Sequence, residues 1–418
     1  MIKSNKFKQT EIGKIPEDWE VVKLRDVASY ISEKINIDEV NLNNFISTEN
    51  MLPDKGGITI ASSLPQTGKV SCFKEGDILF SNIRTYFKKL WLSKFEGGCS
   101  NDVLVIRTKS SLNNKYLYYF LSQDRFFEFT VLTSKGTKMP RGDKNAIMSY
   151  EVNIPPIQEQ RAIASILNSL DDKIALNRAM NSTFEAIGQA LFKHWFVDFE
   201  FPNGKGKPYR SNGGEMVETE LGEVPKGWMV GTLGDYGTFK NGINYLRDEN
   251  GDTEFFIANV RDIANNKLLL KGSLSRIKIN LKKAEDYLLN DKDILIARSA
   301  SPGETSLVLG NLDKVIYSGF SIRYRLNNTD NYLYFFLIIQ RLKENLSNFA
   351  VGTTLQSVNQ ETLKNMKFVL PLDETLNEFN KIIKSIIDKT YNNLIQNSNL
   401  SKIRDALLPK LMSGEVRV

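Results

Sequence analysis

The chain has 418 residues, 41% of them hydrophobic and 25% charged, which are the proportions of a folded globular protein. At roughly 100 to 200 residues per domain, this length predicts two to four domains. The net charge of +6, from 55 basic and 49 acidic residues, permits nucleic-acid binding without demonstrating it. Two cysteines and one histidine are too few for a disulfide framework or a Cys/His zinc site.

Membrane insertion and secretion find no support in the sequence. No apolar run approaches the ~20 residues that cross a bilayer, and residues 1–10 lack the apolar core of a signal peptide. We therefore expect a cytoplasmic protein without membrane contact.

An internal repeat fills the chain. Residues 10–26 read TEIGKIPEDWEVVKLRD and residues 219–235 read TELGEVPKGWMVGTLGD, with eight of seventeen positions identical. The match continues in the same order while the offset drifts from 209 to 216, through Asp77/Asp293, Tyr116/Tyr332, Gly136/Gly352, Thr137/Thr353 and Pro155/Pro371. Conserved order across this length predicts two copies of one structural unit.

Each copy begins with a mixed α/β domain, which we place at residues 1–155 and 219–371. Short β-prone runs bounded by Gly, Asn and Ser predict strands at 77–83, 102–108, 293–299 and 320–326. Two longer apolar segments, 114–129 and 330–346, predict helices. The strand order does not follow from these patterns.

Each copy then continues into a long amphipathic helix, at residues 156–200 and 372–418. Apolar positions at alternating spacings of four and three run from Ile163 to Trp195 and from Phe379 to Leu411, interrupted by Gly188 and Arg404. A helix of ~40 residues is about 60 Å long, too long for a 150-residue domain to cover. Pairing of the two helices is therefore favoured over packing of each helix on its own domain.

The connection between the copies predicts how the helices pair. Residues 201–218 contain two prolines and four glycines and predict a loop that redirects the chain. The resulting order of domain, helix, loop, domain and helix implies pseudo-twofold symmetry. We therefore expect an antiparallel coiled coil that joins two mixed α/β domains, which are the target-recognition domains if the resemblance described below holds.

Four asparagines occupy the middle of the predicted helix seam. Asn177 and Asn181 recur as Asn393 and Asn397, 216 residues later. Buried asparagines cost stability but fix helix register. An antiparallel pair places Asn177 opposite Asn397 and Asn181 opposite Asn393, whereas slightly rotated helices would leave the four side chains in solvent.

Catalytic motifs are missing from the sequence. There is no Gly-rich cofactor loop after a first strand, no Asn/Asp-Pro-Pro-aromatic motif and no GxxxxGK[ST] loop. Asp171 and Asp172 lie beside Lys173 in a helix, which is more typical of a solvated face than of a metal site. A Ser-His-Asp triad would need His194, which lies among bulky apolar residues of a helix. We expect no catalytic residues and no metal ligands.

Basic residues gather in loops and at strand ends of both domains. Between Arg84 and Lys94, basic residues are interleaved with Tyr86 and Phe87, and this segment contains no acidic residue. Such runs are usually solvated surface, but recurrence in two repeated domains favours contacts with DNA phosphates and base edges. The candidate DNA-binding residues are Arg84, Lys88, Lys89, Lys138, Arg141, Lys144, Lys278, Arg298 and Ser299.

The whole chain resembles the specificity subunit of a type I restriction-modification system. The resemblance is carried by the two opening motifs, by GDILFSNIR and DILIARSASPG, and by IPPIQEQRAIASILNSLDDKI followed by ALFKHWFVDFEFP. It implies that each α/β domain reads one half of a bipartite site in double-stranded DNA. The helices would set the spacing and dock two methyltransferase subunits, which restriction and motor subunits join. The subunit itself would have no catalytic activity and would bind no cofactor, because S-adenosylmethionine, Mg²⁺ and ATP would bind to its partners.

The resemblance also points to partner-binding residues at the start of the first helix, namely Gln158, Glu159, Gln160 and Arg161. We expect these polar side chains to be exposed, although Gln and Glu are also common at any helix N-terminus. The second copy, LPLDETLNEF, departs from this pattern, so its contact should differ in detail. Two other functions stay open: a single-chain DNA methyltransferase with a divergent cofactor loop, and a coiled-coil scaffold that does not bind DNA.

Overall fold

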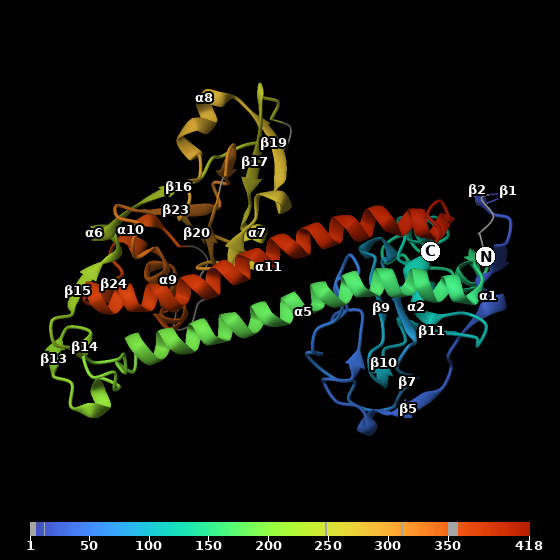
Figure 1. Ribbon diagram of the computed structural model, residues 1–418, viewed down its shortest axis with the longest axis horizontal. Helices are drawn as coiled ribbons and strands as arrows, with labels where there is room; N and C mark the ends of the chain where they lie inside the picture. Colours follow the sequence, from blue (N-terminus) through green and yellow to red (C-terminus); the bar gives the residue numbers. More distant parts are fainter. Residues whose placement is uncertain (1–5, 12, 247–248, 311, 350–357) are drawn as a thin grey trace. The chain divides into compact units, whose positions relative to one another are not determined.

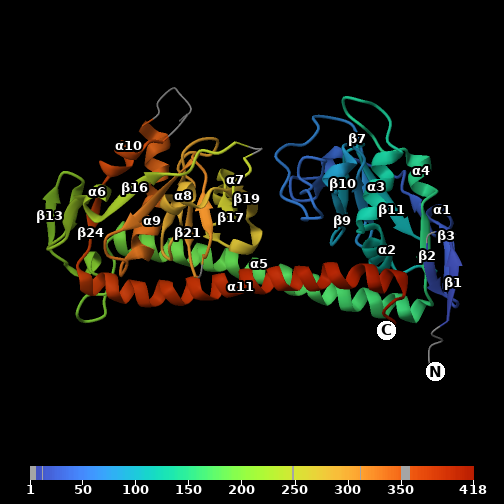
Figure 2. The ribbon, with the colours of Figure 1, turned by 90° about the horizontal axis from the view of Figure 1, so that it is seen from above.

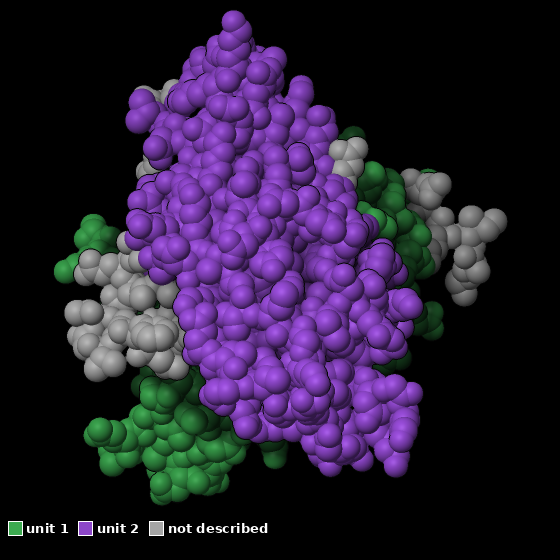
Figure 3. Space-filling model, turned by 90° about the vertical axis from the view of Figure 1, so that its left-hand side faces the viewer, with its two compact units in different colours: residues 1–174, 399–418 green, residues 175–398 purple. Residues whose placement is uncertain are grey.

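The computed structural model describes residues 6–11, 13–246, 249–310, 312–349 and 358–418. They form two compact units, shown in different colours in Figure 3. Unit 1 comprises residues 1–174 and 399–418, and unit 2 comprises residues 175–398. Each unit therefore contains one α/β domain together with segments of both long helices.

Unit 1 is built on two four-stranded sheets (Figure 1). One is antiparallel throughout, in the order β4 (Ala28–Tyr30), β11 (Val103–Thr108), β8 (Ile78–Ser81) and β9 (Leu90–Leu92). The other has the order β5 (Lys34–Asn36), β7 (Lys69–Phe73), β10 (Gly97–Cys99) and β6 (Phe45–Ile46). Two ribbons pair β1 (Phe7–Thr10) with β2 (Gly13–Pro16) and β3 (Glu20–Lys23) with β12 (Glu151–Ile154). The helices are α1 (Leu24–Val27), α2 (Asn114–Leu121), α3 (Asp124–Leu132) and α4 (Lys144–Met148).

Unit 2 repeats this plan with a five-stranded sheet. Its order is β16 (Gly237–Asn241), β23 (Ser321–Leu326), β20 (Ile294–Ala297), β21 (Thr305–Val308) and β18 (Leu268–Leu269). A three-stranded sheet contains β19 (Ser275–Ile279), β17 (Thr253–Ala258) and β22 (Val315–Tyr317). The ribbons pair β13 (Met216–Thr219) with β14 (Gly222–Pro225) and β15 (Met229–Thr232) with β24 (Lys367–Leu370). The helices are α6 (Leu233–Tyr236), α7 (Val260–Asn265), α8 (Leu281–Ala284), α9 (Tyr332–Phe349) and α10 (Gln360–Lys364).

The strand pairing confirms the internal repeat and corrects its alignment. Tyr116 donates its hydroxyl hydrogen to the carbonyl oxygen of Asn153, and Tyr334 donates to the carbonyl oxygen of Val369, the residue that corresponds to Asn153. Tyr116 therefore corresponds to Tyr334, not to Tyr332, because β23 begins 218 residues after β11 whereas β20 begins 216 after β8. The matched residues Gly352 and Thr353 lie outside the described residues.

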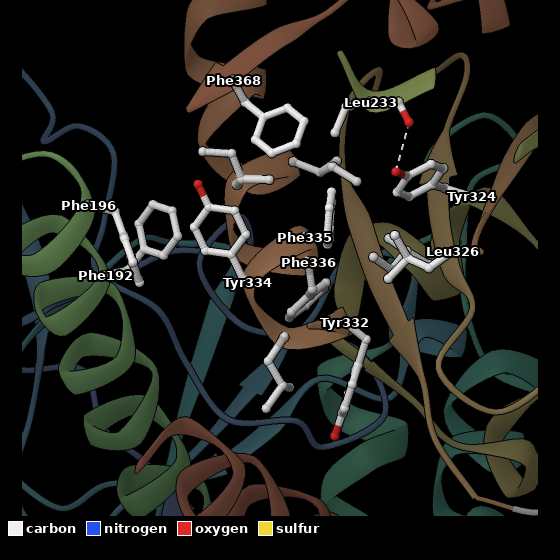
Figure 4. Close-up of a cluster of buried hydrophobic side chains, with 14 of the residues drawn as sticks. Phe192, Phe196, Leu233, Tyr324, Leu326, Tyr332, Tyr334, Phe335, Phe336 and Phe368 are labelled. Atoms are coloured by element: carbon white, nitrogen blue, oxygen red, sulfur yellow. Dashed lines mark hydrogen bonds between the residues drawn. The ribbon is translucent and has the colours of Figure 1, made fainter. Parts of the chain in front are cut away.

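The cores explain why the apolar runs form strands. Every residue of β8 and β20 is buried, because each strand lies inside its sheet with neighbours on both sides. In unit 2, aromatic residues of α9 pack beside the sheet and beside Phe192 and Phe196 (Figure 4). Tyr324 of β23 satisfies its buried hydroxyl by donating to the carbonyl oxygen of Leu233, 2.9 Å away. The predicted helix 114–129 is instead two helices, α2 and α3, separated at Ser122 and Gln123.

The two long helices are α5 (Ile157–Phe196) and α11 (Asp373–Ser413), and within each unit they lie side by side (Figures 1 and 2). In unit 1, Asp171 of α5 pairs with Arg404 of α11; in unit 2, Asn177 pairs with Asn397. Between these two contacts the residue number rises along α5, from 171 to 177, while it falls along α11, from 404 to 397. The helices are therefore antiparallel, as the sequence predicts.

The interruptions of the seam are accommodated in different ways. In unit 1, Arg404 binds Asp171 across 2.7 Å, and Tyr119 of α2 donates its hydroxyl hydrogen to the same carboxylate across 2.8 Å. Burial and the neighbouring Asp171 raise the pKa of Tyr119, so this hydroxyl keeps its proton. In unit 2, Gly188 instead lines a cavity of about 330 Å³ beside Leu337 and Ile387. The unit 1 seam thus tolerates an arginine because a carboxylate neutralises it.

Candidate nucleic-acid interface

Corresponding turns follow β8 in unit 1 and β20 in unit 2. The backbone N–H of Asn82 donates to the carbonyl oxygen of Asp102 (2.8 Å), and that of Arg298 donates to the carbonyl oxygen of Phe320 (2.9 Å). Asn82 then accepts from the N–H of Gly142, as Arg298 accepts from that of Val358. Arg298 therefore corresponds to Asn82 in the repeat. These hydrogen bonds bring three loops together at the same edge of each domain.

The turn in unit 1 is rigid and conformationally strained. Arg84 and Lys88 flank a short 3-10 turn, and both have positive φ angles, 49° and 53°. The adjoining Asp54 and Lys55 also have positive φ, and their N–H groups donate to the carbonyl oxygens of Phe87 and Lys88. Non-glycine residues rarely adopt this conformation, and such strain concentrates at functional sites. The shape of this turn is thus fixed by neighbouring loops.

The candidate cations of unit 1 divide into two groups. Lys88 pairs with Asp124 (2.7 Å), Lys89 donates to the carbonyl oxygen of Thr48 (2.6 Å), and Arg141 pairs with Asp102 (2.9 Å). These three side chains hold loops together in addition to contributing charge. Arg84, Lys138 and Lys144 are exposed at the same edge, and so is the paired Arg141. Arg84 and Arg141 are close in the backbone, because the N–H of Arg84 donates to the carbonyl oxygen of Pro140.

The unit 2 candidates are less concentrated. Arg298 and Ser299 are partly exposed in the turn after β20, and the next residue, Ala300, has a positive φ of 63°. This matches the positive φ of Arg84, two residues after Asn82. Lys278 is exposed on β19, a strand of the other sheet. The structure therefore associates Arg298 and Ser299 with the equivalent edge and leaves Lys278 on a different element.

An ion pair with a buried aspartate lies at the start of the strand that precedes each turn. Asp77, just before β8, accepts two hydrogen bonds from Arg107 of β11, at 2.7 and 2.6 Å. Asp293, just before β20, accepts two from Arg325 of β23 at the same distances. These bonds raise the pKa of both guanidinium groups. Both copies of the repeat thus contain a bidentate ion pair between neighbouring strands of the sheet that carries the turn.

The expectation that all four polar side chains at the start of α5 are exposed is wrong for two of them, and partner binding by this segment stays a prediction. Gln158 and Arg161 are exposed, but Glu159 and Gln160 are only 3% and 1% exposed. Glu159 accepts from the indole N–H of Trp19 (3.2 Å) and from Arg417 (2.7 and 2.9 Å), while Gln160 bonds the backbone around Pro155 and Asn113. The cause is helical geometry, because these two positions face the domain core. Their counterparts Thr375 and Leu376 are buried as well.

The seam asparagines make the predicted contacts in unit 2. Asn177 is fully buried and donates to the side-chain oxygens of Asn397 (2.9 Å) and Gln396 (2.7 Å). Asn393 donates to the side-chain oxygen of Asn181 (2.8 Å). The alternative of four solvent-facing asparagines is wrong. Their effect on helix register stays a prediction.

Among the residues that the structure describes, no cluster of three or more His, Cys, Asp and Glu side chains could hold a metal ion. Within the same residues, no helix combines the length and the apolar character that membrane crossing requires. The candidate site therefore consists of surface loops, and its described residues form no metal-binding cluster.

A model of the type I restriction modification DNA specificity domain matches residues 16–186 and 225–404. The chain belongs to this family. Both repeat copies of the specificity domain family are thus present, and each match extends from an α/β domain into the following long helix.

Relatives of the family are similar along the full chain. The MjaIX specificity subunit of a type I restriction enzyme from Methanocaldococcus jannaschii is 29% identical, over 99% of this chain and 96% of the relative. The HindI specificity subunit from Haemophilus influenzae is 25% identical, over 96% of this chain and all of the relative. A crystal structure of a type I restriction-modification S subunit from M. genitalium superposes with a TM-score of 0.55 at 15% identity, covering 98% of both chains, and shows that the fold is shared.

Proposed function

We propose that this chain is the non-catalytic specificity subunit of a type I restriction-modification complex, in which each α/β domain reads one half of a bipartite site in double-stranded DNA. The observation that carries the proposal is the duplicated edge: both domains present corresponding turns after β8 and β20, held by equivalent hydrogen bonds. Side chains in such loops can reach base edges while a rigid sheet fixes their position. The family match to both copies supports the same reading.

The long helices act in this proposal as the spacer between the half-sites. At ~1.5 Å per residue, 40 and 41 helical residues extend about 60 Å. In this proposal the contacts of Asn177 and Asn181 would keep the helices from sliding, because a shift would leave amide groups unpaired. A fixed register would translate into a fixed distance between half-sites.

The same helices offer repeated surfaces for two copies of a methyltransferase subunit. Ile166 and Ile382 are exposed and lie 216 residues apart, as are Ile187 and Ile403. Single exposed apolar residues are common on any surface, but their recurrence at the repeat offset distinguishes these isoleucines. Because the pairs recur at the repeat offset, they would suit two identical partners. Restriction and motor subunits would join that core.

The partners would supply the chemistry. S-adenosylmethionine would bind to the methyltransferase subunits, and ATP and Mg²⁺ to the motor and nuclease subunits. In this proposal the chain acts in the cytoplasm, on the DNA that its partners modify.

Co-expression with the methyltransferase subunit of the same locus tests the proposal. We expect methylated adenines at one bipartite motif across the genome, and no methylation when either protein is expressed alone. Replacement of residues 219–371 by the equivalent segment of a relative should change one half-site only. A change of both halves would contradict modular reading, and methylation by the chain alone would instead support a single-chain methyltransferase.

A further inference from the structure

Exposed aromatic side chains occur at the equivalent edges of both domains. In unit 1, Tyr86 and Phe87 lie in the strained turn after β8 and are 49% and 40% exposed. In unit 2, Phe320 is 66% exposed, and its carbonyl oxygen accepts the hydrogen bond from Arg298 that defines the corresponding turn. The two domains thus expose aromatic rings at one structural location, although from different loops.

Three contacts hold the backbone of the turn that carries Tyr86 and Phe87 in unit 1. The carbonyl oxygen of Phe87 accepts from Asp54, the N–H of Arg84 donates to Pro140, and Lys88 binds Asp124 on α3. The rings also contact each other, with centroids 4.7 Å apart. A rigid loop of this kind loses little conformational entropy when its side chains bind a ligand.

The backbone around Phe320 is held with similar firmness. Gly319 donates its N–H to the carbonyl oxygen of Ile243 (2.8 Å), and Ser321, which is fully buried, donates to Ser318 (2.9 Å). Phe320 is therefore an exposed ring between two anchored neighbours. A role in the hydrophobic core does not explain a phenylalanine at this position, because the Phe320 side chain points into solvent.

Basic residues accompany both sets of rings. Arg84, Lys88 and Lys89 lie in the same turn as Tyr86 and Phe87, and the Nζ of Lys89 is 5.8 Å from the centroid of the Phe87 ring. The backbone N–H of Arg298 donates to the carbonyl oxygen of Phe320, so a basic residue is hydrogen-bonded to the residue that carries this ring. Aromatic rings among cations match the chemistry of DNA, in which charged phosphates flank apolar base faces and thymine methyl groups.

We propose that Tyr86 and Phe87 in the first domain, and Phe320 in the second, are specificity-determining residues that make apolar contacts with the bases of their respective half-sites. The proposal rests on the proposed function and deepens it, because it assigns base discrimination to aromatic rings and leaves phosphate attraction to the neighbouring cations. Each set acts on one half-site only.

The test uses the full chain in complex with its methyltransferase subunits. Three variants are compared with wild type: the double variant Tyr86→Ser and Phe87→Ser, the single variant Phe320→Ser, and the control Phe7→Ser, which removes an exposed ring from β1. Binding to the genomic site is measured in competition with DNA altered in one half-site at a time. Methylation is mapped genome-wide.

We expect about 10-fold or greater loss of discrimination at one half-site for the double variant and at the other half-site for Phe320→Ser. The Phe7→Ser complex should behave as wild type. Discrimination equal to that of the control would overturn the inference while leaving the proposed function intact. Complexes that no longer assemble would assign the rings to a protein contact, and a wild-type complex without bipartite methylation would remove the proposed function itself.

Discussion

Asn177 of α5 donates its side-chain N–H to the side-chain oxygen of Asn397 on α11, across 2.9 Å, in the interior of unit 2. The neighbouring Asn181 and Asn393 make the matching bond at 2.8 Å. Both contacts join residues whose numbers sum to the same value, as an antiparallel register requires. Polar pairs at core positions of a helix seam define one alignment, because any slip buries amides without partners.

Removal of one asparagine should cost more than removal of both. We expect Asn177→Ala to lower the free energy of unfolding by about 1–3 kcal/mol, since Asn397 then loses its partner at a partly buried position of the seam. The double variant Asn177→Leu and Asn397→Leu should recover most of that loss and weaken the register. Denaturant unfolding measures the stability, and the exposed Asn392→Ala serves as control. Additive effects of the two sites would show that the asparagines are not coupled.

The repeated ion pairs of Asp77 and Asp293 should be important to each domain. Asp77→Ala or Asp293→Ala leaves Arg107 or Arg325 without its carboxylate, and the expected loss is about 1.5–3 kcal/mol because each guanidinium stays partly exposed. Hydrogen exchange of β11 or β23 should accelerate in the affected domain. The control is Asp198→Ala, which breaks a largely exposed pair with Lys193 and should cost less than about 1 kcal/mol. Equal effects at the two kinds of pair would refute this role.

The features that sequence predicts well are those set by local pattern. The four strands after Asp77, Asp102, Asp293 and Phe320 follow from apolar runs, and the paired helices follow from a spacing of four and three over forty residues. The contact between Asn177 and Asn397 could be predicted from the internal repeat and the antiparallel direction of the helices. Each of these depends on neighbours close in sequence or on exact repetition.

The features that sequence missed depend on distant residues. Glu159 faces the domain core, and its carboxylate is tolerated there because Trp19 and Arg417, which are 140 and 258 residues away, bind it. Nothing in the segment IPPIQEQ reveals those partners. The strained turn at Arg84 likewise depends on the loop at Asp54. Alternation of cations with Tyr86 and Phe87 was the one available signal for exposed rings, whereas Phe320 opens an apolar run and resembles a core residue.

Gly188 is a site where substitution should stabilise the protein. A methyl group there would lie 3.8 Å from Ile383, an ordinary contact, and alanine is better than glycine inside a helix by about 1 kcal/mol. We expect Gly188→Ala to raise the free energy of unfolding by about that amount. Gly142→Ala provides the contrast, since its methyl group would lie 2.8 Å from the side-chain oxygen of Asn82. Destabilisation by Gly188→Ala would mean that the cavity is needed for folding.

Affinity for DNA should depend steeply on salt through the cations at the candidate edges. If Arg84, Arg141 or Arg298 contacts a phosphate, its replacement by alanine should reduce the log-log salt slope by about 0.9. Arg141→Ala should show an additional structural effect, because Asp102 loses its partner. The control is Lys226→Ala, an exposed cation between β14 and β15. An unchanged slope and affinity over several salt concentrations would remove that arginine from the interface.

Partner docking should depend on the exposed isoleucines of the long helices and not on Glu159. Ile166→Asp should weaken binding of one methyltransferase subunit and Ile382→Asp the binding of the other, because each change places a charge on an apolar surface. The double variant should therefore bind none, which size measurement of the purified complex detects. Ser165→Asp, at an exposed position next to Ile166, controls for charge alone. Glu159→Ala should instead destabilise unit 1, since Arg417 and Trp19 lose their acceptor. Complexes that keep two methyltransferase subunits in the double variant would assign docking to another surface of the helices.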